Sequence, residues 1–515
     1  MLHFSDLAIL TSYYTVLLAL AVYGFHRMMM VYLYYRNRSN RPVAGTPLSP
    51  LPVVTVQLPV FNERYVVERL IRAIAALEYP SHLLEIQVLD DSTDETSAIA
   101  RRAVERERAR GVDIRFIHRD HRTGYKAGAL KEGMEQSRGE LIYIFDADFV
   151  PPPAFIRDTL DFFSDPEVGM VQARWDHLNR DFSLLTRLQS ILLDGHFVVE
   201  HTARHRSGRF FNFNGTAGAW RRRTIEEAGG WNSDTLTEDV DLSYRAQLGR
   251  WKFVYLKDVV SPAEVPVDIN GFKTQQHRWS KGAIQTGKKL LPRIFRSAFP
   301  LRVKIESFFH LTNNLSYPLV IALSILVFPA MVIRHRLGWT RLILLDFPLF
   351  FVSTFSVVLF YAASQREIDP RWVRKLRYLP MVMSLGIGLA VNNAHAVLEA
   401  LLGRSGEFRR TPKYSIGEGA AEWQGKAYRT RVNLSFPFEV ALAAYFALTI
   451  GISLEEGIYL AIPFLLIFFS GYFYMTLLTV AQQVSRLGAP ERLAAVRAPG
   501  TASSGATRLP PSAEA

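Results

Sequence analysis

The distribution of apolar residues constrains this chain more than any other feature of its sequence. Long runs with few charges occupy residues 1–30 and about 305–482, whereas the stretch between them has the composition of a water-soluble domain. About 20 consecutive apolar residues are enough to cross a bilayer as a helix. A chain of 515 residues has room for two substantial parts. We therefore predict a membrane protein with a large soluble insert.

The first apolar run, residues 7–30, is followed by positive charges at Arg36, Arg38 and Arg41. Positive charge after the run, with no small-residue cleavage pattern, favours an uncleaved anchor over residues 1–35. Because basic residues stay on the cytoplasmic side, the N-terminus should lie outside and the next domain in the cytosol. The expected location is the plasma membrane, or the inner membrane of a bacterium.

The second apolar region, residues 301–484, contains five separate runs. They cover about 308–333, 342–363, 379–402, 435–454 and 457–480. The run at 379–402 carries Asn392, Asn393, His395 and Glu399, and a basic loop follows it at about 403–434. Crossing the bilayer there would place that loop outside, against the positive-inside tendency. We therefore predict five spans, counting the N-terminal anchor, and one helix at the membrane interface.

Charge and cysteine content narrow the functional classes. The net charge of +12 is explained by basic residues beside the spans, and it also suits anionic lipid headgroups or a diphosphate. We recognise no nucleic-acid-binding module. The chain has no cysteine, which excludes disulfides, a thiol nucleophile and a cysteine zinc site. The tail at 485–515 is rich in Ala, Pro, Ser and Gly, and we expect it to be disordered.

The soluble part, residues 45–300, alternates short apolar strands with amphipathic helices. The predicted strands are Val53–Val60, Ile86–Leu89, Ile114–Ile117, Leu141–Phe145 and Val168–Ala173. The predicted helices between them include Glu63–Leu77, Glu95–Arg110 and Lys126–Gln136. Such alternation predicts an α/β domain with a doubly wound, mostly parallel sheet. Ligands of such sheets bind at the carboxyl ends of the strands.

Acidic residues follow two of these strands directly. Asp90 and Asp91 end the segment IQVLDD, and Asp146 and Asp148 end LIYIFDAD. At one edge of a sheet these carboxylates would repel one another, and a divalent cation would relieve that repulsion. Oxygen ligands favour Mg²⁺ or Mn²⁺, either of which can also bridge a diphosphate.

Two later motifs each allow two interpretations. Thr237-Glu238-Asp239 is either a helix start with acids near the dipole, or it holds a general base at Asp239. The helix that follows Gln275 brings Gln275 and Arg278 to one face, with Trp279 beside them. That segment is either a basic interfacial helix, or a site that grips phosphate and stacks on a sugar ring.

Taken together, the motifs resemble a known family. They occur in the order Pro59–Glu63, Asp90–Ser92, Tyr125–Leu130, Asp146–Asp148, Thr237–Asp239 and Gln275–Trp279. This series is similar to the D, DxD, TED, QxxRW signature of inverting family-2 glycosyltransferases of the cellulose synthase superfamily, which have the GT-A fold. Val171–Trp175 and Phe211–Gly218 resemble more closely the plant cellulose-synthase-like A and C groups. Those groups make β-1,4-mannan, glucomannan or the glucan backbone of xyloglucan.

The resemblance implies roles for individual residues. It places Phe61, Glu63, Asp90 or Asp91, Lys126 and Asp146 at the donor nucleotide sugar, and Asp148, with Asp146, at the metal. It makes Asp239 the base, Arg278 the partner of the departing diphosphate, Gln275 part of the same motif, and Trp279 the stacking surface for the acceptor. Asn214 and Gly215 would lie by the acceptor channel. Phe408, Thr411 and Lys413 resemble a gating loop of the pattern FxVTxK, in which Arg410 replaces valine.

Three functions remain open at this point. The first is a processive polysaccharide synthase that uses UDP-glucose or GDP-mannose and passes its product through its own spans. The second is a glycolipid synthase that transfers one sugar to a membrane lipid. The third, a non-catalytic export or scaffold subunit, is disfavoured because every expected acid is present. A homo-oligomer or a secretion partner is compatible with each of them.

Overall fold

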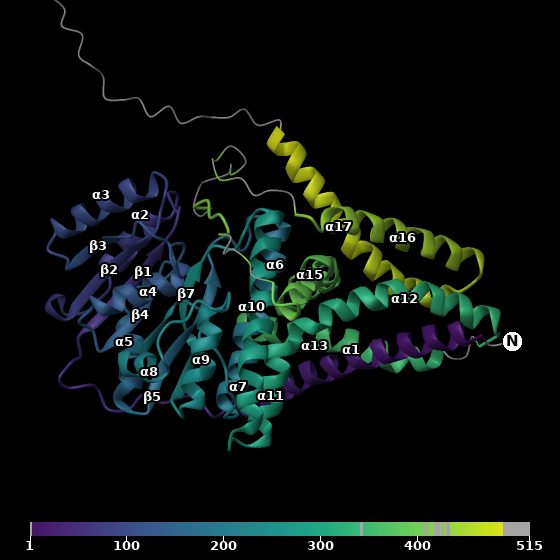
Figure 1. The fold of residues 1–515 in the computed structure, drawn as a ribbon, viewed down its shortest axis with the longest axis horizontal. Coiled ribbons are helices and arrows are strands. Elements are labelled where there is room, and N and C mark those ends of the chain that lie inside the picture. Colours follow the sequence, from purple (N-terminus) through teal and green to yellow (C-terminus); the bar gives the residue numbers. More distant parts are fainter. Residues whose placement is uncertain are drawn as a thin grey trace, which may run out of the picture.

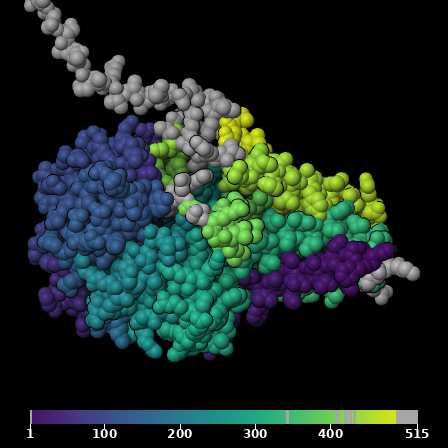
Figure 2. All heavy atoms as spheres, viewed as in Figure 1, coloured from purple at the N-terminus to yellow at the C-terminus, as the bar shows by residue number. Residues whose placement is uncertain are grey.

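The computed structural model describes residues 3–339, 343–404 and 433–487, together with residues 406, 410–416, 423, 426 and 428. Phe408 and most of the predicted tail lie outside the described residues. The chain forms an α/β body at one end and a bundle of long helices at the other (Figure 1). In the space-filling view the helices extend from this body as a narrower arm (Figure 2).

The body is built on a seven-stranded sheet in the order β3-β2-β1-β4-β6-β5-β7. The strands are β1 (Val54–Val60), β2 (Leu84–Asp90), β3 (Ile114–His118), β4 (Leu141–Ile144), β5 (Val168–His177), β6 (Gly218–Arg221) and β7 (Lys252–Ala263). Neighbouring strands are parallel except that β6 runs antiparallel to both β4 and β5. The mostly parallel α/β fold predicted from the sequence is confirmed.

Helices cover both faces of the sheet. On one face lie α2 (Val67–Ala75), α3 (Thr96–Arg108) and α5 (Phe155–Leu160), and on the other lie α4 (Tyr125–Glu135) and α9 (Glu238–Leu248). Strand β4 contributes to both cores, because Leu141 and Tyr143 face the first and Ile142 and Ile144 the second. A strand buried on both faces must be apolar throughout, which explains the near-continuous apolar runs in the sequence.

Several further elements complete the body or connect it to the helical arm. They are η1 (Ser81–Leu83), η2 (Asp161–Ser164), α6 (Leu184–Asp194), the π-helical turn η3 (Gly195–His201), α7 (Thr202–Arg206), α8 (Arg222–Glu227) and α10 (Ile269–Arg296). Of these, α10 is the longest, and it packs against α9 in the body and against α15 (Ala390–Leu401) and α11 (Leu301–Thr312) in the arm.

The arm contains α1 (Phe4–Arg36), α11 (Leu301–Thr312), η4 (Asn313–Leu315), α12 (Ser316–Arg336), α13 (Ile343–Ile368), α16 (Phe436–Glu455), η7 (Tyr459–Ala461) and α17 (Ile462–Leu487). Among the described residues, five helices are long and apolar enough to cross a membrane. They lie at the positions of the five predicted spans, and the bent helix pair over residues 372–401 would be a sixth if it crossed as one span. The N-terminal helix α1 packs between α12 and α13 despite their distance in sequence (Figure 1).

The run at 379–402 is bent rather than straight. It comprises α14 (Leu379–Gly388), preceded by η6 (Trp372–Tyr378), and α15 (Ala390–Leu401), with a bend of 40° between the two parts. We expected its polar face to be wet, but Asn392 and Asn393 are buried. Asn392 donates to the Lys273 carbonyl of α10 at 2.9 Å and accepts from Asn433 at 2.7 Å. Protein groups thus take the place of water on part of this face.

Candidate active site

A cavity of about 180 Å³ opens at the carboxyl ends of β1, β2 and β4. It collects side chains from motifs that lie far apart in the sequence. Those predicted residues that line it are Phe61, Glu63, Asp91, Lys126, Asp146, Asp148, Asn214, Gly215, Asp239, Gln275, Arg278, Trp279, Thr411 and Lys413. The parallel strands end at this edge, and the residues that follow them therefore meet there. We call this space the donor-side cavity.

The two acids at the end of β2 have different surroundings. Asp90 is fully buried, lies 2.7 Å from His118 Nδ1, and accepts hydrogen bonds from the Ser97 hydroxyl and the Ser92 amide. It does not line the cavity. Asp91 does line it, and there it accepts two hydrogen bonds from Arg119, at 2.7 and 2.6 Å.

Lys126 connects three of the predicted segments. Its Nζ donates to Asp146 Oδ1 at 2.5 Å and to the Gly215 carbonyl at 2.8 Å. Burial opposes the charge, but Asp146 and the acids of α9 outweigh it and raise the pKa of the ammonium. Gly215 has a φ of +79°, and a Cβ there would stand 3.1 Å from Asp239 Oδ2. A residue without a side chain therefore lets the lysine and Asp239 approach each other.

Asp239 lies in the first turn of α9, next to Glu238. Burial, together with the charge of Glu238, raises the pKa of Asp239 to about 7, although Lys126 acts in the opposite direction. Arg278 lies in the same field, where burial lowers the pKa of its guanidinium against the attraction of Glu238, Asp146 and Asp239. A carboxylate with a pKa near neutrality can accept and release a proton at physiological pH.

Three residues of segment 410–416, namely Arg410, Thr411 and Lys413, line the donor-side cavity. Arg410 donates to both oxygens of Glu63, at 2.9 and 2.7 Å, and Lys413 Nζ donates to Asp148 Oδ2 at 2.7 Å. Asp148 Oδ2 also accepts from the Glu264 amide at 3.2 Å. Burial raises the pKa of Glu63 to about 7 even though Arg410 opposes this shift. Arg410, which departs from the gating-loop pattern, is thus a principal contact of this segment.

The acids of this cavity fit a divalent cation. Asp146 and Asp148 both line it, and each already binds one ammonium group, from Lys126 and Lys413 respectively. Carboxylate oxygens are the ligands that Mg²⁺ and Mn²⁺ prefer. The Lys413 ammonium marks a position at Asp148 where a positive charge is stable.

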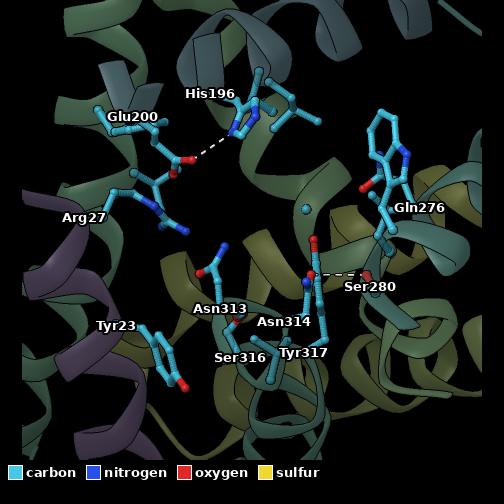
Figure 3. Close-up of a pocket in the computed structure, with 18 of the residues that line it drawn as sticks. Tyr23, Arg27, His196, Glu200, Gln276, Ser280, Asn313, Asn314, Ser316 and Tyr317 are labelled. Carbon is cyan, nitrogen blue, oxygen red and sulfur yellow. Dashed lines mark hydrogen bonds and ion pairs between the residues drawn. The ribbon is translucent and has the colours of Figure 1, made fainter. Parts of the chain in front are cut away.

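A second cavity, of about 500 Å³, lies among the long helices. We call it the helix cavity. Its end near the body is polar and includes Tyr23, Arg27, His196, Glu200, Gln276, Ser280, Asn313, Asn314 and Tyr317 (Figure 3). Its far end is apolar and includes Leu17, Leu20, Leu323, Phe350, Phe464 and Phe468. The two cavities share Trp175, Leu193, Asn214, Thr237, Asp239, Gln275 and Trp279.

A π-helical turn supplies polar groups that the sequence analysis missed. In η3, His196 Nδ1 lies 2.9 Å from Glu200 Oε2, and His196 Nε2 lies 3.0 Å from the Asn214 amide (Figure 3 draws the first contact). Arg204 then joins Glu200 to Glu306. The spacing of His196 and Glu200, four residues apart on one helical face, was the available signal. π-helical turns are rare and occur frequently at functional sites.

Comparison with known proteins identifies the body. Residues 52–282 match the model described as "Glycosyltransferase like family 2". Glucomannan 4-beta-mannosyltransferase 1 of Oryza sativa subsp. japonica is 44% identical over 298 residues, which are 56% of this chain and 57% of that protein. Glucomannan 4-beta-mannosyltransferase 2 of Arabidopsis thaliana is 47% identical over 254 residues, or 48% of each chain. This chain thus spans about half the length of the curated relatives it matches.

Solved structures also resemble the chain. A mannosyltransferase from Pyrobaculum calidifontis, in complex with GDP-Man and Mn²⁺, has a TM-score of 0.49 and 18% sequence identity. The match covers 76% of this chain and 99% of that one. The family-2 glycosyltransferase domain expected from the sequence motifs is confirmed by the family model over residues 52–282, and the plant relatives are similar over about half of the chain. The chain therefore carries a family-2 glycosyltransferase domain.

Proposed function

We propose that this protein is an inverting hexosyltransferase that extends a β-linked polysaccharide from a nucleotide-sugar donor. The position of Asp239 carries the proposal, because this residue lies on the wall shared by the donor-side cavity and the helix cavity. Its plant relatives are named as glucomannan 4-beta-mannosyltransferases, which favours a mannan or glucomannan product. The donor would be GDP-mannose or UDP-glucose.

On the acceptor side, Asp239 acts as the general base. The terminal sugar of the acceptor enters from the helix cavity and stacks on Trp279, which lines both cavities. Its hydroxyl oxygen attacks the anomeric carbon of the donor sugar while Asp239 takes the hydroxyl proton. The pKa of about 7 suits this task, since a base is most effective when its pKa lies near the working pH.

On the donor side, positive charge meets the departing diphosphate. Lys126 and Arg278 line that cavity and would stabilise the negative charge that develops on the leaving oxygen. Asp146 and Asp148 would hold Mg²⁺ or Mn²⁺, which would neutralise the same charge when bound. The new carbon–oxygen bond forms as the bond to phosphate breaks on the opposite face. A single displacement of this kind inverts the anomeric configuration.

The helix cavity would carry the growing polymer. Hydroxyl, amide and charged groups at its near end can exchange hydrogen bonds with sugar hydroxyls in place of water. The five helices able to cross a membrane would then place the body in the cytosol and the apolar end of the cavity towards the outside. Transfer and export would thus share one path.

A lipid acceptor is the second candidate, because the far end of the helix cavity is lined by leucine and phenylalanine. An acyl chain could occupy that apolar end while a lipid headgroup reached Asp239. The polar near end favours a sugar chain, since charged groups such as Arg27 and Glu200 suit hydroxyls better than hydrocarbon.

Product analysis tests the proposal. Purified protein in lipid nanodiscs receives Mn²⁺ or Mg²⁺ with radiolabelled GDP-mannose, UDP-glucose or both. We expect an ethanol-insoluble polymer that endo-β-mannanase or endo-β-glucanase degrades. Label found solely in an organic-extractable glycolipid would favour the lipid acceptor and contradict polysaccharide synthesis.

A further inference from the structure

A cluster of metal-binding residue types lies outside both cavities. His277 of α10 meets His395 and Glu399 of α15, two helices that pack side by side (Figure 1). One ligand atom from each residue lies within 4.8 Å of the others. Among the residues that the structure describes, this is the one group of three or more His, Asp or Glu with that property.

Two nitrogen–oxygen distances in this cluster are close to those between ligands of a tetrahedral ion, and each ends on a different oxygen of Glu399. His277 Nε2 lies 3.4 Å from Glu399 Oε2, and His395 Nε2 lies 3.5 Å from Glu399 Oε1. Zinc binds imidazole nitrogen and carboxylate oxygen at about 2.0–2.2 Å, so tetrahedral ligand atoms stand roughly 3.3–3.6 Å apart. His395 and Glu399 are four residues apart and therefore project from one face of α15.

We propose that His277, His395 and Glu399 bind one divalent transition-metal ion of the Zn²⁺ class. Two imidazoles and one carboxylate select zinc or cobalt over magnesium, whereas the all-carboxylate set of the donor-side cavity prefers Mg²⁺ or Mn²⁺. The side chain of His395 is 51% exposed, so the ion can enter from solvent and keep water as a fourth ligand. This site does not depend on the proposed transfer reaction.

Lys281 is the group that competes for this position. Its Nζ lies 2.9 Å from Glu399 Oε2. The carboxylate therefore already binds one cation. A lysine side chain is flexible enough to move away when a doubly charged ion arrives. Lys288, two turns further along α10, binds the carbonyls of Ala400 and Leu401 rather than this carboxylate.

A bound ion would fix α15 against one particular turn of α10. His277 directly precedes Arg278 and Trp279, both of which line the donor-side cavity. The metal would therefore join the bent helix pair to the turn that carries these two side chains. Binding should accordingly raise the thermal stability of the folded protein by mass action.

Cobalt titration of the whole protein tests the site. Protein purified without a histidine tag and stripped of metal is titrated with Co²⁺ in excess Mg²⁺, which saturates the carboxylates of the donor-side cavity. We expect one Co²⁺ per chain with the strong visible absorption of four-coordinate cobalt, displaced by Zn²⁺. The chain has no cysteine, so no thiolate contributes to the spectrum.

Two variants show whether the three residues form a metal-binding site or merely lie close to one another. His395→Ala should weaken Co²⁺ binding at least about tenfold, and Lys281→Met should strengthen it by removing the competing ammonium. His335→Ala is the matched control, since His335 also pairs with a glutamate, Glu456, at 3.3 Å. Equal affinity in His395→Ala and the unaltered protein, or no four-coordinate spectrum in either, would overturn the proposal.

Discussion

The two cavities that meet at Asp239 differ in how they handle charge. In the donor-side cavity three acids each bind a separate cation: Lys126 binds Asp146, Lys413 binds Asp148, and Arg410 binds Glu63. In the helix cavity His196, Glu200 and Arg204 form one network at the near end, and the far end is apolar. One space is suited to a ligand with several charges, and the other to a long neutral one.

This difference fits the proposed transfer reaction. When the donor binds, its diphosphate would pair with the lysines and the arginine, and its metal would pair with the carboxylates, so that each ion pair is exchanged for a new one. A neutral sugar chain gains little from such pairs, and it moves more easily past apolar side chains that do not hold it. We infer that charge fixes the donor in place, whereas the weak contacts of the helix cavity let the product advance.

Replacing Asp239, where the two cavities meet, should have the largest effect on the rate of sugar transfer. Asp239→Asn keeps the size of the side chain but removes its ability to accept a proton. Transfer should fall by roughly 10²–10⁴-fold, while the affinity for the nucleotide sugar, measured by calorimetry, stays within about twofold of the original. Turnover retained at the original rate would show that another group is the base.

Filling the helix cavity should impair polymer formation without affecting donor binding. Gly386 lines that cavity, and a Cβ at this position meets no atom within 4 Å. Gly386→Trp should therefore shorten the polymer and lower incorporation of labelled sugar by about tenfold, the order of loss expected from misplacing an acceptor. Donor affinity should be unchanged.

Gly451→Trp provides the control for this variant. Gly451 also has open space at its Cβ, but it lies on the exposed surface of α16 and does not line the cavity. Normal polymer length in both tryptophan variants would mean that the product does not pass through the helix cavity.

Removing Lys413 should show whether its ammonium group competes with a metal ion for Asp148. Because Lys413 occupies Asp148, Lys413→Met should let Mn²⁺ bind roughly two- to fivefold more tightly, as expected for loss of one competing ion pair. Paramagnetic resonance of free Mn²⁺ measures this directly. Lys426→Met removes a nearby lysine that binds the Tyr414 carbonyl instead, and it should leave Mn²⁺ affinity unaltered. Weaker Mn²⁺ binding in Lys413→Met would contradict the competition.

The smallest expected effect is a shift in pH dependence. Asp239 has a pKa raised to about 7, so its active, ionised form is lost as the pH falls through that value. Glu238→Gln removes a neighbouring negative charge that raises this pKa, and the acid limb of kcat/KM should move to lower pH. Glu226→Gln, on exposed α8, serves as the control. An unmoved limb would show that Glu238 does not set the pKa.

The fold could be predicted where burial dictates the sequence pattern. All five predicted strands are present within a few residues of their expected ends, because strands buried on both faces must be apolar. β6 and β7 were not predicted. β6 has just four residues, and β7 carries Lys252, Lys257 and Asp258 where it is partly exposed, so neither has a long apolar run.

The order of the motifs along the sequence predicted which segments meet at the candidate site. The residues next to each motif did not predict the contacts that its individual side chains make. Asp90 and Asp91 are adjacent and equivalent in sequence, yet hydrogen bonds from Ser97 and His118 hold Asp90 away from the donor-side cavity. Such partners depend on strand pairing, which a single sequence does not reveal. The polar turn that holds His196 and Glu200 has a spacing that could have been noticed, but the cavity that its residues face is formed by distant helices and is not visible in the sequence.

Site-specific labelling tests most directly whether the product enters the helix cavity. The chain has no cysteine, so Gly386→Cys introduces a single thiol that lines this space, and Gly451→Cys introduces one outside it. The rate of modification by a small thiol reagent is measured with and without nucleotide sugar and Mn²⁺. We predict that synthesis slows modification at position 386 at least about tenfold and leaves position 451 unaffected. Equal rates at position 386 during synthesis and at rest would contradict the account.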